Sequence, residues 1–173
     1  MQTFPLDGFT GQELKLALFK NVSNGQDIKR KYSNRVALID ADLVLSVFQV
    51  RIAATMAAEK EKNGKMKTRS LPFEVLWSLS GSKNMSASLE TFSVQGNKGA
   101  ALLVAAIGLQ EGELQPVLED VQGEPSSLNE LGVGKDEGES RERLMKLYKI
   151  TGDELLMSTL EECILMRMAV KDH

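Results

Sequence analysis

The sequence has little of what catalytic and metal sites use most. Its one histidine, His173, stands at the last position, and its one cysteine, Cys163, lies in an apolar run. This leaves too few side chains for a Ser-His-Asp or Cys-His nucleophilic site, or for zinc held by imidazoles and paired thiolates. Carboxylates are numerous but fall mostly on predicted solvated faces. We therefore expect no enzyme, no bound metal and no cofactor.

Disulfides and long apolar runs are also missing. A single cysteine cannot close a disulfide within the chain, so a buried, inert thiol in a reducing compartment is expected. No stretch has the basic start and apolar run of a signal peptide, and none approaches the roughly 20 apolar residues that cross a bilayer. We therefore expect a cytoplasmic and nuclear protein that does not contact membranes.

Aromatic residues and net charge are low as well. Only 5% of residues are aromatic while 42% are hydrophobic, so the core must be built from aliphatic side chains. A length of 173 residues suits a single domain spanning 1–173. The net charge of −3 argues against a globally basic nucleic-acid binder, so any such site must be a local patch.

Hydrophobic patterning predicts a mixed α/β (α+β) fold, with a small central β-sheet covered by helices and a helical C-terminus. The region 108–142 reads as loosely structured, with one short helix at 114–121 and room for an edge strand. The apolar segment 100–107 has the length of a strand buried on both faces. Strands are predicted at 14–19, 36–39 and 100–107, and helices at 28–32, 47–63, 70–79, 84–92, 114–121 and 141–148 and in the last segment. Periodicity leaves the strand directions open.

Several residues mark helix ends. Gly64 stands where a C-terminal glycine belongs, and Ser70 precedes a helix with Pro72 in its first turn. Capping-box spacing, in which a side-chain oxygen and a residue three positions later satisfy each other's amides, predicts three further helix starts. They are Ser23 with Gln26, Thr151 with Glu154, and Ser158 with Glu161.

A basic cluster is the clearest candidate site. Five positive charges, Lys60, Lys62, Lys65, Lys67 and Arg69, lie within ten residues and lead to the predicted helix start at Ser70. Amides at a helix start favour anions, and lysine and arginine neutralise phosphates. The cluster fits an RNA backbone or another polyanion. It also fits a solvated loop balanced by neighbouring acids, and spacing alone leaves both readings open.

An apolar stripe on the last helix is the second candidate. Leu160, Ile164 and Met168 recur every four residues and share one face. Such a stripe fits packing into the core. It also fits a face that binds a partner protein, because methionine-rich apolar helices adapt well to other proteins.

Three blocks of the sequence resemble a known family. The first runs from 64 to 80 and contains Gly-Lys-Met-Lys-Thr-Arg-Ser-Leu, and the second runs from 84 to 92. The third comprises 147–150 and 160–172 near the C-terminus. In order and spacing these blocks resemble the PRPK-binding protein (TPRKB) family of the KEOPS/EKC tRNA-modification complex. The resemblance covers most of the chain and is weakest between 108 and 142.

The resemblance implies a non-catalytic subunit of the complex that forms N6-threonylcarbamoyladenosine at position 37 of tRNAs reading ANN codons. It implies binding to the amino-terminal lobe of a PRPK-type atypical kinase and recruitment of tRNA through its 3′ CCA end. By this resemblance the tRNA contacts are expected at Lys65, Lys67, Thr68 and Arg69. The kinase-binding residues are expected among Leu89, Phe92, Leu160, Ile164 and Met168, which share their pattern with core residues.

The chain departs from the family pattern at two places. Met56 stands where the family has a lysine, which removes a phosphate contact, and Ser93 replaces a glycine after Phe92 at a helix end. Neither change touches the basic cluster. Two other functions remain as alternatives: a protein-only interaction module without tRNA contact, and an enzyme that uses a phosphate-bearing small molecule at the basic cluster.

Overall fold

The computed structural model describes residues 1–6, 8, 12–96 and 98–171. Within this part of the chain, five strands form one sheet of order β1-β2-β4-β3, and β5 pairs with β2 on the same side as β1. All of these pairings are antiparallel, which settles the direction that the sequence left open. The strands are β1 (Gln2–Pro5), β2 (Glu13–Val22), β3 (Ala37–Asp40), β4 (Ala100–Ile107) and β5 (Glu124–Ser126).

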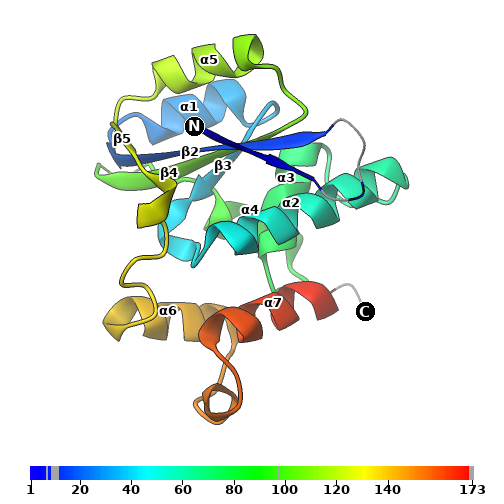
Figure 1. Cartoon of the computed structure of the whole chain (residues 1–173), viewed down its shortest axis with the longest axis vertical. Coiled ribbons are helices and arrows are strands. Elements are labelled where there is room, and N and C mark those ends of the chain that lie inside the picture. Colours follow the sequence, from blue (N-terminus) through cyan, green and yellow to red (C-terminus); the bar gives the residue numbers. More distant parts are fainter. Residues whose placement is uncertain (7, 9–11, 97, 172–173) are drawn as a thin grey trace.

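Helices cover both faces of this sheet (Figure 1). The first two, α1 (Gly25–Tyr32) and α5 (Glu111–Asp120), lie on one face. On the other face lie α2 (Val47–Lys62), α3 (Leu71–Leu79) and α4 (Met85–Phe92). Beyond them, α6 (Gly138–Tyr148) and α7 (Leu160–Val170) form an outer layer. Three short 3-10 turns, η1 (Ala41–Leu43), η2 (Leu128–Glu130) and η3 (Glu154–Leu156), complete the described elements. The predicted mixed α/β class is confirmed.

Two hydrophobic clusters hold these layers together. Leu102 and Val104 of β4 face α1 and α5, whereas Leu103 and Ala105 face α2 and α3. The strand is therefore buried on both faces, as its unbroken apolar run predicted. The larger cluster continues from the sheet through α2 and α3 into α6 and α7. The outer helix layer is thus part of the main core.

The region 108–142 holds α5, β5, η2 and the start of α6. Its predicted helix begins at Glu111, three residues before the expected position. β5 occupies the place left for an edge strand, whereas β1 was not predicted. The four residues of β1 are mostly exposed and include a proline, so they give no alternating apolar pattern.

Two of the predicted capping boxes are wrong. The N-cap of α1 is Asn24, and the hydroxyl of Ser23 lies 3.3 Å from the carbonyl oxygen of Gln122. The capping box of α7 forms between Thr159 and Glu162, one residue later than predicted. Both registers fit the sequence, because residues 158–162 read Ser-Thr-Leu-Glu-Glu. In the structure the Glu161 carboxylate accepts the hydroxyl of Ser46 instead, which leaves Glu162 to pair with Thr159.

The other helix ends agree better with their sequence signals. Thr151 and Glu154 bond reciprocally, with the Thr151 amide donating to the Glu154 carboxylate over 2.7 Å. Gly64 follows α2 with a φ of +65°, in the left-handed region that glycine tolerates best. Ser70 occupies the N-cap position of α3, but its hydroxyl makes no capping bond.

Candidate functional site

The basic cluster forms the loop that joins α2 to α3. We call residues 65–70 the basic loop. The amide of Lys65 donates to the carbonyl of Lys60 over 2.7 Å, and the amide of Gly64 donates to the carbonyl of Glu61, a paired pattern that ends helices tightly. The side chains of Lys65, Lys67 and Arg69 are exposed, so the loop displays its positive charges to solvent.

Thr68 of the basic loop is oriented differently from its neighbours. It is half-buried, and its hydroxyl lies 2.6 Å from a carboxylate oxygen of Glu74, a residue of α3 that is completely buried. Thr68 was expected among the tRNA contacts, but its hydroxyl faces the protein interior. The sequence signal that could have found this pairing is the six-residue separation of a hydroxyl and an acid across a predicted helix start.

Arg69 rests on an aromatic ring. Its guanidinium carbon lies 4.3 Å from the centre of the Phe73 ring, within the range of a cation–π contact. Stacking restricts the guanidinium while leaving its edge open to solvent and to anions. The contact with Phe73 therefore orients the Arg69 guanidinium at the surface of the basic loop.

A pocket of 460 Å³ opens beside the basic loop. Arg35 and Arg69 contribute positive charge to it, and Glu61 contributes a carboxylate. The Arg35 guanidinium also donates to the carbonyl oxygen of Glu113 over 3.0 Å, which ties it to α5. The apolar wall is formed by Leu71, Pro72, Val75, Ala105, Ile107 and Leu109. Sequence reasoning missed Arg35, because only the fold brings it next to a loop 30 residues away.

The residues expected to bind the kinase are mostly buried in this conformation. Leu89 is half-buried, whereas Phe92, Leu160, Ile164 and Met168 all lie in the main hydrophobic core. The stripe on the last helix therefore packs inward, and these four side chains form no surface that a partner could contact here. Apolar periodicity could not separate the two readings, because a core face and an interface face have the same spacing.

Exposed apolar side chains lie instead on η3 and on the outer side of α7. Leu156 is 81% exposed and Met157 is 88% exposed, and Met166 and Val170 of α7 are also exposed. We call these four residues the η3–α7 surface. Large apolar side chains exposed to this extent are characteristic of protein-binding sites when they gather on neighbouring elements. The sequence offered a signal in the run Leu155-Leu156-Met157, which lies between two helix starts.

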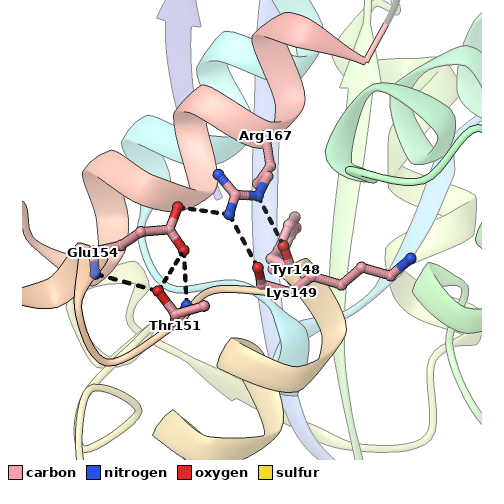
Figure 2. Close-up of polar contacts among 5 residues, drawn as sticks. All are labelled: Tyr148, Lys149, Thr151, Glu154 and Arg167. Atoms are coloured by element: carbon pink, nitrogen blue, oxygen red, sulfur yellow. Dashed lines mark hydrogen bonds and ion pairs between the residues drawn. The ribbon is translucent and has the colours of Figure 1, made fainter.

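Arg167 of α7 holds the segment that carries Leu156 and Met157 (Figure 2). Its guanidinium donates to the carbonyl oxygens of Tyr148 and Lys149 over 3.1 and 3.0 Å, and to the Glu154 carboxylate over 2.6 Å. Lys149 has a φ of +55°, and this left-handed turn ends α6 and reverses the chain. The three bonds join α6, η3 and α7 at one point, and we call them the Arg167 brace.

Glu154 completes this brace. The amide of Thr151 and the guanidinium of Arg167 both donate to its carboxylate, and these bonds hold the pKa of Glu154 below its usual value.

Among the described residues, no group of three or more histidine, cysteine or acidic side chains could hold a metal ion. Nor does any helix in the described ranges have the length and hydropathy to span a membrane.

Comparisons with known proteins agree with the family resemblance. Residues 19–172 match the family described as kinase binding protein CGI-121. The EKC/KEOPS complex subunit TPRKB of Danio rerio is 31% identical over 159 residues, covering 90% of this chain and 89% of the relative. The EKC/KEOPS complex subunit CGI121 of Yarrowia lipolytica is 27% identical over 146 residues, covering 82% of each chain. The resemblance is confirmed: this chain belongs to the CGI-121 family of kinase-binding proteins.

Proposed function

We propose that this chain is a non-catalytic subunit of an EKC/KEOPS complex, that it binds the PRPK-type kinase subunit, and that it helps to recruit tRNA. The observation that carries the proposal is the match of residues 19–172 to a family of kinase-binding proteins. The names of two relatives as EKC/KEOPS complex subunits support membership in the complex. The reaction served would be formation of N6-threonylcarbamoyladenosine at position 37 of tRNA.

The kinase would bind at the η3–α7 surface. Leu156 and Met157 are the most exposed large apolar side chains in the described residues, and a partner that covers them removes apolar area from water. Arg167 ties η3 to the end of α6 through the Glu154 carboxylate, which would lower the ordering cost of binding. Of the residues expected from the sequence, Leu89 alone retains some exposure.

The kinase surface can be tested by titration calorimetry with the cognate PRPK-type kinase. Replacing Leu156 and Met157 together by glutamate should weaken binding at least about hundredfold, because central apolar contacts dominate such interfaces. The control is Val133→Glu, which places a glutamate at an apolar side chain that is 73% exposed on another part of the chain. Equal binding by the double variant and the control would place the kinase elsewhere.

The tRNA would bind at the basic loop and its pocket. Lys65, Lys67 and Arg69 present exposed cations, and Arg35 adds a fourth across the pocket. The apolar pocket wall, built from aliphatic side chains, offers a surface against which an unpaired base can pack. A flexible 3′ CCA end, which is single-stranded, would use both features.

The tRNA site can be tested by fluorescence anisotropy of labelled tRNA with the chain in complex with its kinase. Lys67→Glu with Arg69→Glu should weaken binding and reduce its dependence on salt, because fewer phosphate contacts release fewer counterions. Arg30→Glu with Lys98→Glu makes the same change of charge at exposed positions away from the loop and should have little effect. Kinase binding without measurable tRNA affinity would favour the protein-only interaction module.

A further inference from the structure

Glu74 lies directly beneath the basic loop. No part of its side chain is exposed, although it is a carboxylate on the first turn of α3. Its Oε2 accepts the amide of Lys67 over 3.1 Å, the amide of Thr68 over 2.9 Å and the hydroxyl of Thr68 over 2.6 Å. One buried carboxylate therefore holds two successive amides and a hydroxyl of the loop.

Lys60 balances the buried charge. Its Nζ lies 3.5 Å from the other Glu74 oxygen, Oε1, and its side chain is largely buried at the end of α2. Burying a carboxylate without such a partner would be costly, so the pair belongs together. The carbonyl oxygen of Lys60 also accepts the amide of Lys65. Lys60 and Glu74 thus fix the loop at its start and at its middle.

The fixed backbone has a consequence for the side chains. With the Lys67 and Thr68 amides turned inward to Glu74, the side chains of Lys65, Lys67 and Arg69 remain exposed. Phe73, the residue before Glu74, supports the Arg69 guanidinium. Two neighbouring residues of α3 therefore arrange the cations of the loop without being exposed contacts themselves.

We propose that Glu74 is a positioning residue for nucleic-acid binding, and that Thr68 acts through Glu74 instead of contacting RNA. This inference rests on the proposed tRNA site and names the residue that prepares it. A loop that is already ordered loses less conformational freedom on binding than a mobile one, so the same cations bind more tightly. Loss of the Glu74 contacts should lower affinity and leave the number of phosphate contacts unchanged.

Salt dependence separates positioning from the loss of a cation that contacts phosphate. We would measure the tRNA dissociation constant of the kinase complex at several salt concentrations for the wild type, Thr68→Val, Thr68→Ser and Lys67→Gln. Thr68→Val should weaken binding about tenfold at every salt concentration, with a parallel slope, because one hydrogen bond to a charged group is lost. Thr68→Ser keeps the hydroxyl and should restore binding. Lys67→Gln should reduce the slope by about 0.7 to 0.9, the change expected for one phosphate contact.

Hydrogen exchange of the RNA-free chain separates positioning from a neutral contact between the Thr68 hydroxyl and RNA. Thr68→Val should speed exchange of the Lys67 and Thr68 amides, whereas a direct contact would leave their protection unchanged. A second variant, Lys60→Met with Glu74→Met, replaces the buried pair by apolar side chains of similar size, an exchange that proteins often tolerate. It should expose the same two amides to exchange and reproduce the loss of tRNA affinity, while circular dichroism confirms the fold.

Three results would overturn the proposal. Unchanged tRNA affinity in Thr68→Val, with Lys67→Gln weakened, would show that the loop needs no support from Glu74. Weakened tRNA binding in Thr68→Val with unchanged protection of the Lys67 and Thr68 amides would assign Thr68 to direct contact. If neither Thr68→Val nor Lys67→Gln weakens binding, the proposed tRNA site itself has failed, and the role of Glu74 in RNA binding fails with it.

Discussion

The basic loop and the η3–α7 surface, the two proposed binding regions, are built in opposite ways. The basic loop displays cations, and beneath it the Glu74 carboxylate accepts two backbone amides. The η3–α7 surface displays apolar side chains, and beside it the Arg167 guanidinium donates to two backbone carbonyls. In the first case a helix side chain satisfies backbone amides of a loop, and in the second a helix side chain satisfies backbone carbonyls at the end of α6.

This difference shows how an exposed recognition segment can be held without a regular structure of its own. Irregular backbone leaves amides and carbonyls without ladder partners, and buried ones must find them elsewhere. An acidic side chain can accept hydrogen bonds from amides that point inward, and an arginine can donate hydrogen bonds to carbonyls that point inward. The exposed residues proposed to contact a partner are therefore distinct from the residues that hold the segment.

The largest difference between the two regions is expected in the variant Arg167→Met. This change removes three hydrogen bonds and should lower the free energy of unfolding by about 2 kcal/mol, because two carbonyls and a carboxylate lose a charged donor. Kinase affinity should fall about thirtyfold while tRNA affinity of the free chain stays within about twofold, since the basic loop has its own anchor. Chemical denaturation and binding titrations would measure both.

The control for this variant is Arg141→Met. Arg141 bonds to Asp136 at the exposed start of α6, so its loss should change neither binding reaction. An equal loss of tRNA and kinase affinity in Arg167→Met would contradict the separation of the two surfaces.

Sequence reasoning found the elements of the fold better than the contacts between them. β4 was predicted because an eight-residue apolar run has one dominant explanation. The kinase-facing residues were expected on the stripe Leu160, Ile164 and Met168, which the structure places in the core. The stripe pattern is set by burial alone and does not say whether the covering partner is another helix or another protein.

The basic loop shows the same limit. Its charges, its place before α3 and the glycine that ends α2 were all readable from the sequence. The roles of Thr68 and Arg35 were not, because they depend on a buried acid and on a residue brought in by the fold. Helix ends can be predicted from residues that are adjacent in the sequence, whereas these contacts depend on three-dimensional packing.

A smaller effect is expected where the outer layer meets α3. The Tyr148 hydroxyl donates to the carbonyl of Leu79 over 2.6 Å and lies 3.1 Å from the Gln49 amide nitrogen, with all three groups buried. Tyr148→Phe should lower the free energy of unfolding by about 1.5 kcal/mol, because two buried polar groups lose a partner. In the control Tyr32→Phe, a half-buried hydroxyl loses its bond to Asp120, and the effect measured by denaturation should be clearly smaller. Equal effects of the two substitutions would contradict the prediction that the buried Tyr148 hydroxyl contributes more to stability than the Tyr32 hydroxyl.

Salt should affect tRNA binding and kinase binding differently. Raising monovalent salt from about 0.1 to about 0.3 M should weaken tRNA binding at least about tenfold, because the three exposed cations of the basic loop release counterions. The same change should alter kinase binding less than about twofold, because apolar contacts are not screened. A strong salt dependence of kinase binding would indicate that the basic loop faces the kinase.

The smallest expected effect concerns acid. Because its hydrogen bonds lower the pKa of Glu154, its contribution to stability is present above the ordinary glutamate pKa and is lost as the pH falls through the folded-state value. Denaturation between about pH 5 and about pH 3 should show a shallower loss of stability in Glu154→Gln than in the wild type. Identical pH profiles of the two proteins would show that the bonds of Glu154 do not contribute to stability.

The most direct test of kinase binding is size-exclusion chromatography with light scattering on this chain mixed with its cognate PRPK-type kinase. At micromolar concentrations we expect one peak with the mass of a one-to-one complex, and two separate peaks when Leu156 and Met157 are both replaced by glutamate. Two separate peaks for the wild-type chain would contradict the central claim that this protein is a kinase-binding subunit.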